Sequence, residues 1–274
     1  MTEQAMFVPC TSVVHAADIA ERVKNFSLFG VPISRLNFQD TIAQVMNWAE
    51  QRERTRLVTF SNVHMLTEGH KKPWFRAIHT AMDMNCPDGA PLVWLGRTMA
   101  EGVERVSGPD FMRHFCKQTA QSGLRHFFYG GGDGTAECVI EKLRQDCPGI
   151  QIAGSYTPPF GQITSSEDDE AVLQINNSQA DILWVCLGCP KQEIWMYEHR
   201  DRLRVGVVLA VGQAFDITAG RVPRAPAIMQ NNGLEWLYRL SCEPGRLGRR
   251  YLSSNTMFLW LIFRSLLHAD RLQT

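Results

Sequence analysis

The sequence predicts an α/β protein built on a parallel β-sheet with helices on both faces, followed by a basic helical appendage. Strand-like apolar runs alternate with helical patterns from residue 29 to residue 220, which is typical of parallel sheets. The runs at 182–187 and 205–211 are apolar at nearly every position, as expected of strands buried on both faces. The pattern changes after Gly220, where arginine dominates the charged residues.

We therefore divide the 274 residues into an N-terminal tail (1–28), an α/β core (29–220) and a C-terminal appendage (221–274). The tail has no firm pattern and carries charges where a signal peptide would need a sustained apolar stretch, so we expect no secretory leader. Eight cysteines without regular spacing fit a reducing cytoplasm better than a disulfide scaffold.

Charge is unevenly distributed along the chain. The net charge is zero, but the appendage has eight arginines, no lysine and three acidic residues, so its net charge is +5. This asymmetry indicates an anionic partner for the appendage, such as a phosphate-bearing ligand, an anionic membrane surface or nucleic acid. The acidic character of the remaining chain argues against nucleic acid.

The first half of the core is expected to alternate as follows. Residues 29–34 form a short strand or turn, Asp40 caps a helix that ends near residue 52, and a strand spans 56–61. A helix covers about 73–82, and the prolines and glycine of 83–91 predict an irregular loop. Asp110 is expected to cap the next helix, which ends near residue 121.

The second half continues the alternation. Strands are expected at 126–130, 150–155, 182–187 and 205–211, and helices at 135–145, at 165–176 and after Pro190. The acidic run at 167–170 is interpreted as a solvated first helical turn, because carboxylates are favourable at helix amino ends.

The glycine-rich segment 130–134 joins a predicted strand to a predicted helix, where glycines let the backbone approach a phosphate closely. Glu137 stands where the third glycine of the dinucleotide fingerprint belongs, and the strand at 150–155 does not end in a ribose-binding acid. An NAD(P)-dependent oxidoreductase is therefore an alternative with little support. A non-catalytic nucleotide-binding protein at a membrane is a second alternative.

A C-x-x-C pair, Cys186 and Cys189, ends the strand at 182–187. Such pairs occur in redox centres and zinc sites. The sequence has no second pair of this kind, and Cys186 falls inside the apolar run, where an inert buried thiol is usual. We predict neither a metal site nor redox chemistry here.

Polar residues follow several predicted strands. Lys191, Gln192 and Glu193 begin the helix after the strand at 182–187, where free N–H groups favour phosphate. Asn62 follows the strand at 56–61. Asp88 lies on a stiff turn, where a carboxylate either serves catalysis or only initiates the turn.

Taken together, these segments resemble the WecG/TagA/CpsF family of bacterial glycosyltransferases over about residues 30–251. The motifs that carry the resemblance are PDG (87–89), RVSGPD (105–110), FYGG (128–131), LGCPKQE (187–193), VGQAFD (211–216), RAP (224–226), LEWLYRL (234–240), EP (243–244) and RRY (249–251).

The resemblance implies a Rossmann-like, inverting and metal-independent transferase. It would move a sugar from a UDP-sugar to a polyprenyl-pyrophosphate-linked sugar in surface-polysaccharide assembly, at the inner face of the cell membrane and without a cofactor. Asp88 would be the general base, and the resemblance raises it from one of two equal interpretations to the favoured one.

The resemblance also implies further site residues. Asn62, Arg105, Gln192, Gly131 and Gly132 would contact the substrates. Where the family has a threonine, this chain has Phe60, so the neighbouring hydroxyls of Thr59 or Ser61 are candidates to replace it.

In the family the appendage completes the active site and brings the enzyme to the membrane. Arg239, Arg246 and Arg249 fall at its arginine positions and would stabilise the leaving diphosphate. Arg250, Arg264 and the apolar run 257–263 are assigned to the lipid surface. The alternative for that run is a helix packed on the core, and the two interpretations stay open. The sequence also leaves the donated sugar, the accepting sugar and self-association into a homo-oligomer open.

Overall fold

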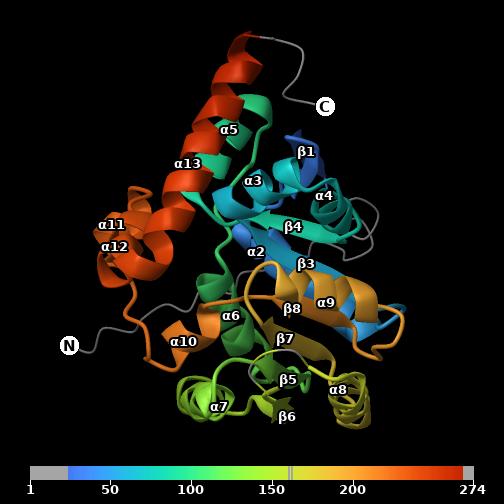
Figure 1. Ribbon diagram of the computed structural model, residues 1–274. Coiled ribbons are helices and arrows are strands. Elements are labelled where there is room, and N and C mark those ends of the chain that lie inside the picture. The colour runs from blue at the N-terminus through green and yellow to red at the C-terminus, as the bar shows by residue number, and fades with distance from the viewer. Residues whose placement is uncertain (1–23, 160, 162, 268–274) are drawn as a thin grey trace, which may run out of the picture.

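The computed structural model describes residues 24–159, 161 and 163–267. Within them, a six-stranded parallel sheet with the order β4-β3-β8-β7-β5-β6 forms the centre of the molecule (Figure 1). Its strands are β3 (Arg56–Ser61), β4 (Met84–Pro87), β5 (Arg125–Gly130), β6 (Gln151–Tyr156), β7 (Ile182–Cys186) and β8 (Val207–Ala210). The predicted α/β class with a parallel sheet is confirmed.

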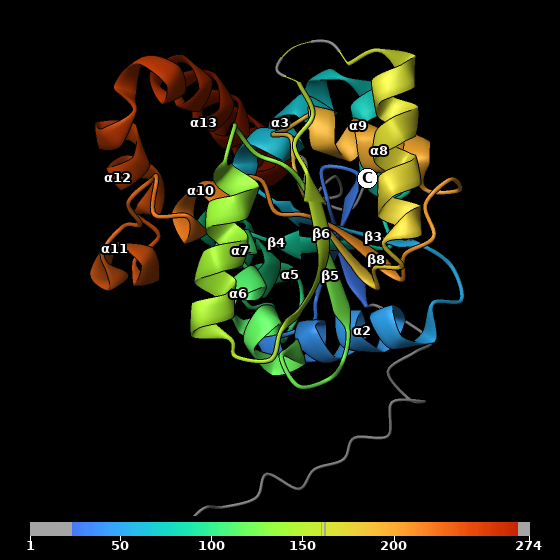
Figure 2. The same cartoon turned by 90° about the horizontal axis from the view of Figure 1, so that it is seen from below.

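Helices cover both faces of this sheet, and Figure 2 shows α7 and α8 on opposite sides of it. One face packs against α2 (Phe38–Gln51), α6 (Gly108–Thr119) and α7 (Thr135–Asp146). The other face packs against α4 (Pro73–Thr80), α8 (Ser165–Asn177) and α9 (Lys191–His199). Because both faces are covered, the central strands are apolar throughout rather than alternating.

A hairpin outside the main sheet begins within the predicted N-terminal tail. Residues 25–28 form β1 (Asn25–Leu28), which pairs antiparallel with β2 (Val31–Ser34). Phe29 and Gly30 connect them with φ angles of 53° and 79°, as two-residue hairpin turns require. The hairpin packs on α3 (Val63–Lys71) and α5 (Ala90–Met99). Residues 1–23 of the predicted tail lie outside the described residues.

The segment 83–91, predicted as a loop, instead holds β4 and the start of α5. Met84 and Cys86 are buried, and β4 pairs in parallel with β3. The sequence prediction was wrong because a four-residue strand containing Asn and Pro has little strand preference of its own and depends on burial by its neighbours. The Asp88 N–H donates to Ser61 O at 2.7 Å, so Asp88 lies directly at the carboxyl end of β3 and β4.

Two helices begin earlier than predicted. Asn37 rather than Asp40 caps α2, and its Oδ1 accepts from the Asp40 N–H at 2.8 Å. Ser107 rather than Asp110 caps α6. The Asp110 carboxylate instead accepts two hydrogen bonds from Arg224, at 2.6 and 2.5 Å, and so ties the start of the appendage to the core.

The appendage is helical. After α10 (Ala214–Thr218), the chain forms α11 (Ala227–Asn231), α12 (Glu235–Cys242) and α13 (Pro244–Leu267), and α13 lies alongside α3 (Figure 1). Phe258 and Leu261 of α13 are buried against the hairpin, and the Phe258 ring meets Phe29 edge-on at 5.8 Å. The apolar run therefore contacts the core along one side of the helix.

The opposite side of α13 is exposed. Leu259, Trp260 and Phe263 have 66%, 47% and 61% of their surface accessible. No helix in the described part of the chain is both long and apolar enough to cross a bilayer. The run thus combines one packed side with one open apolar side.

Candidate active site

A cavity of about 1430 Å³ lies where five strands of the sheet end. Its walls include the residues at or just after the carboxyl ends of β3, β4, β5, β7 and β8, namely Asn62, Asp88, Gly131, Leu187 and Gly212. Helices α12 and α13 close its other side with Glu235, Arg239, Arg250 and Tyr251. Ligands of open parallel sheets bind at this edge.

Asp88 lies in the cavity wall beside one cation. Its Oδ1 is 3.7 Å from Arg105 Nη2, and its Oδ2 accepts a long hydrogen bond from the Gly108 N–H at 3.3 Å. Burial raises the pKa of Asp88 to about 6, against the opposing effect of Arg105. At neutral pH such a carboxylate is ionised yet still a good proton acceptor.

Arg105 is held mainly by the appendage. Its Nη2 donates to Glu235 Oε2 of α12 at 2.5 Å, which is closer than its approach to Asp88. Glu235 is not among the site residues predicted from the sequence. A signal was present, because Glu235 and Arg239 are four residues apart and so share one face of α12.

Asn62 and His64 reach the cavity from the start of α3. Asn62 caps this helix, and its side-chain oxygen accepts from the Met65 N–H at 3.3 Å. His64 Nδ1 and Ser254 Oγ of α13 are 3.0 Å apart. Burial, assisted by the charge of Arg250, lowers the pKa of His64 to about 4, so its ring is neutral.

Gly131 and Gly132, which we expect to approach the nucleotide, lie in the cavity wall. Gly130 and Gly131 have φ angles of +100° and +85°, which favour glycine. The Gly131 N–H donates to Cys186 O at 2.8 Å, which fixes this turn against β7. Gly131 and Gly132 therefore add no side chain to this part of the cavity wall.

Gln192 lines the cavity, but its neighbour Glu193 does not. Gln192 Nε2 donates to Glu193 Oε1 at 2.7 Å, and the Gln192 Oε1 atom has no hydrogen-bond partner among the described residues. Glu193 is fully buried behind it, and burial raises its pKa to about 7. Glu193 is therefore placed to hold Gln192 rather than to touch a ligand.

The C-x-x-C pair is reduced in this structure. Cys186 and Cys189 are both free cysteines. Burial raises the pKa of Cys186 to about 12 and also raises the pKa of Cys189, so neither thiol is activated as a nucleophile.

The appendage arginines are arranged differently from the prediction. Arg239 lines the cavity. Arg249 is exposed and outside the cavity wall, whereas Arg250, assigned to the lipid surface from sequence, lies in that wall. On a helix, neighbouring residues point about 100° apart, so a shift of one position exchanges these roles. Arg246 is in the first turn of α13, and its side chain is outside the described set.

Neither candidate for the missing threonine lines the cavity. Thr59 is buried on β3, and its Oγ1 donates to Asn85 Oδ1 at 2.8 Å. Ser61 is buried as well, and Phe60 between them reaches the cavity wall. Alternate residues of a strand point to opposite faces, so Phe60 alone occupies the site side.

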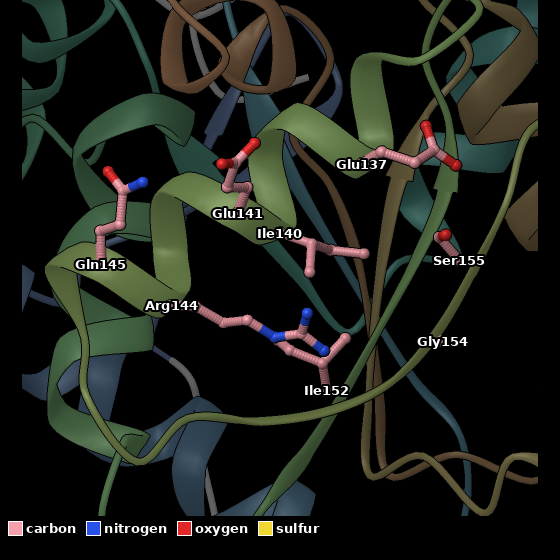
Figure 3. A pocket seen from close by; sticks show the side chains of 8 residues that line it. All are labelled: Glu137, Ile140, Glu141, Arg144, Gln145, Ile152, Gly154 and Ser155. Atoms are coloured by element: carbon pink, nitrogen blue, oxygen red, sulfur yellow. The ribbon is translucent and has the colours of Figure 1, made fainter.

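A second, smaller cavity of about 530 Å³ lies between α7 and the edge strand β6. Figure 3 shows Glu137, Glu141 and Arg144 of α7 beside Ile152 and Ser155 of β6. None of the residues selected from the sequence lines this cavity.

Comparison with known proteins agrees with the resemblance. Residues 26–272 match the glycosyl transferase WecG/TagA/CpsF family. The chain belongs to this family. It is also 30% identical, over 81% of its length and 86% of the relative's, to the N-acetylglucosaminyldiphosphoundecaprenol N-acetyl-beta-D-mannosaminyltransferase of Bacillus spizizenii (strain ATCC 23059 / NRRL B-14472 / W23). As a member of the WecG/TagA/CpsF family, the protein is a glycosyltransferase.

Proposed function

We propose that this glycosyltransferase moves a sugar from a UDP-sugar to a sugar linked through a diphosphate to a polyprenyl lipid, with inversion at the anomeric carbon. The observation that carries the proposal is Asp88, a carboxylate of raised pKa in a cavity that also holds Arg105 and Arg239. The product would serve the assembly of a surface polysaccharide.

The polar end of the cavity suits a nucleotide diphosphate. Gly131 and Gly132 have no side chain that would keep a phosphate away, and Lys191 and Gln192 lie in the wall at the start of α9. Arg239 Nε is buried there and has no hydrogen-bond partner within the described residues. A diphosphate would supply acceptors for such groups.

The other end of the cavity is apolar and suits the lipid of the acceptor. Leu95 of α5 and Phe258, Leu259 and Ile262 of α13 line it. The prenyl chain of the acceptor would pack against these apolar side chains. The name of the Bacillus spizizenii relative describes an acceptor of this chemical class, a sugar joined through a diphosphate to a polyprenyl lipid.

In the proposed reaction, Asp88 removes the proton from the acceptor hydroxyl as that oxygen attacks the anomeric carbon. The bond from this carbon to the UDP oxygen breaks on the opposite face, which inverts the configuration. Negative charge grows on the β-phosphate, and Arg239 and Arg250 stabilise it. We propose that these cations make a metal ion unnecessary.

The exposed side of α13 supports attachment to the inner face of the cell membrane. Trp260 and Phe263 are open to solvent, and the Arg264 guanidinium lies 5.3 Å from the Trp260 ring centroid. Aromatic rings beside arginine suit the interface of an anionic bilayer.

The test is transfer in the presence of a metal chelator. UDP-N-acetylmannosamine and a lipid diphosphate N-acetylglucosamine are the first pair to assay, because the relative's name contains both sugars. We expect a lipid-linked disaccharide and free UDP. Binding of UDP-sugars without transfer to any lipid-linked acceptor would contradict the proposal, as would a strict requirement for a divalent metal.

A further inference from the structure

Glu235 has no acid or base role in the proposed reaction, yet it lies in the cavity wall. The Nη2 atom of Arg105 lies between two carboxylates, 2.5 Å from Glu235 Oε2 and 3.7 Å from Asp88 Oδ1. The guanidinium is therefore shared unequally, and Glu235 has the closer contact.

This unequal sharing matters because an arginine in direct contact with a carboxylate weakens it as a base. An ion pair lowers the pKa of the acid, and proton transfer to a weaker base is slower. The charged groups that act on Asp88 are Arg105 and Arg239, which lower its pKa, and Glu235, which raises it. Burial of Asp88 adds to the effect of Glu235.

The segments that carry this arrangement are linked. Glu235 begins α12, and the bidentate Arg224–Asp110 pair fixes the start of the appendage on α6. Gly108, at the start of the same α6, donates its N–H to Asp88. Docking of the appendage thus places Glu235 at Arg105, the cation that contacts Asp88 in the described part of the chain.

We propose that Glu235 is a positioning residue that holds Arg105 away from the Asp88 carboxylate and so keeps Asp88 basic. This inference rests on the proposed role of Asp88 as the base. The same contact makes the strength of the base depend on a docked appendage, since Asp88 and Arg105 belong to the core and Glu235 does not.

The decisive measurement is the titration of Asp88 by NMR, with ¹³C at the aspartate carboxyl carbons and Asp88→Asn to assign the signal. We expect Asp88 in Glu235→Gln to titrate about one pH unit lower than in the wild type. Glu243→Gln is the matched control, because Glu243 also lies in the appendage and the cavity wall but accepts from Gln213. Glu243→Gln should leave the pH at which Asp88 titrates unchanged. An Asp88 titration that is unchanged or raised in Glu235→Gln overturns the proposal.

A second background tests whether Glu235 acts through Arg105. In the Arg105→Gln background, adding Glu235→Gln should lower the pH at which Asp88 titrates. This decrease should be less than half of the one that Glu235→Gln causes in the wild-type background. An equal effect in both backgrounds would mean that Glu235 acts on Asp88 directly, and the positioning role would be wrong. Glu235→Asp, which keeps the charge, should restore most of the wild-type titration.

Kinetics provide an independent readout. The acidic limb of the kcat/KM profile should move to lower pH in Glu235→Gln, and kcat at its plateau should fall about three- to tenfold with little change in KM. A protein whose Asp88 titrates as expected but which transfers no sugar would contradict the proposed function and leave this inference standing.

Discussion

At the residue scale, Asp88 combines burial with incomplete charge compensation. Its side chain keeps 22% of its surface exposed, and in the described chain the Gly108 N–H is the one backbone group that donates to its carboxylate. A carboxylate whose folded pKa lies above its ordinary value favours the protonated form. It therefore destabilises the fold increasingly as pH rises from about 4 through about 6.

Replacing Asp88 by Asn should stabilise the protein at pH 8, because Asn carries no charge to desolvate. A rise in the pKa of Asp88 to about 6 corresponds to a loss of folding stability of at most roughly 3 kcal/mol at pH 8. Because the side chain is partly exposed, we expect the gain in Asp88→Asn to be about 1–2 kcal/mol. Urea unfolding at pH 8 and pH 4.5 measures this gain, which should be about half as large at the lower pH, because pH 4.5 still lies above the ordinary pKa of an aspartate. The exposed Asp201→Asn serves as control and should change stability little at either pH. A gain that does not depend on pH would contradict the account.

Gly130 should tolerate no side chain. A Cβ there would lie 2.3 Å from Cys186 O, in addition to the strain of its positive φ. Gly123 has a similar φ of +80° but open space around it. Gly123→Ala therefore measures the loss of stability caused by a side chain at positive φ alone, which we expect to be about 1 kcal/mol. We expect Gly130→Ala to cost at least twice as much in urea unfolding. Equal losses would mean that the turn can move away from β7.

At the element scale, the sequence could predict elements with a strong pattern of their own. The strands at 56–61 and 182–187 are apolar runs, and both were placed to within a residue. Strand β4 was missed because its burial depends on β3 beside it. Thr59 was predicted because it is next to the position where the family has a threonine. The structure excludes it from the cavity wall, because its side chain is buried and donates a hydrogen bond to Asn85.

Helices α8 and α9 are joined by a buried polar contact. His199 Nε2 lies 2.6 Å from Asp168 Oδ2, and its Nδ1 lies 2.7 Å from Trp195 O. The His199 ring is thus held between the Asp168 carboxylate and the Trp195 carbonyl. Trp195 Nε1 also donates to Asp168, at 2.8 Å. Asp168 therefore connects the start of α8 to α9, which begins at Lys191 in the cavity wall.

Asp168→Asn should destabilise the protein by about 1–3 kcal/mol at pH 7, because it removes the carboxylate that holds the buried His199 ring and the Trp195 indole N–H. The pKa of Asp168 is lowered chiefly by its hydrogen bonds to His199 and Trp195, against the effect of burial. Its contribution is present above its ordinary pKa and is lost as pH falls through its lower folded value. Asp169→Asn, next in sequence but 68% exposed, should change stability by less than about 0.5 kcal/mol. Similar losses in the two variants would exclude the buried contact as the cause.

At the scale of the whole molecule, the appendage belongs to the core packing as well as to the site. Phe258 and Leu261 bury against the hairpin, while Arg239 and Glu235 reach the cavity. The sequence could assign the arginines to a functional segment by charge, but not which of Arg249 and Arg250 faces the site. That depends on the rotation of α13, which its packing against α3 and the hairpin determines.

The exposed side of α13 should bind anionic vesicles. We expect the variant that carries Leu252→Gln, Phe263→Gln and Leu267→Gln to bind vesicles about a hundredfold more weakly. Each partly inserted side chain should contribute roughly 1 kcal/mol of binding free energy. These residues are 74%, 61% and 64% exposed, so the fold should be kept. Leu173→Gln, 58% exposed on α8, is the control and should bind like the wild type. Vesicle sedimentation measures both, and unimpaired binding by the triple variant would place the membrane contact elsewhere.

The most direct test of the central claim is the initial rate of sugar transfer by the wild type and by Asp88→Asn, with the anomeric configuration of the product determined by NMR. We predict an inverted product and a rate about 10²- to 10⁴-fold lower in Asp88→Asn, the range expected for loss of a general base. Undiminished transfer by Asp88→Asn, or a product with retained configuration, would contradict this prediction.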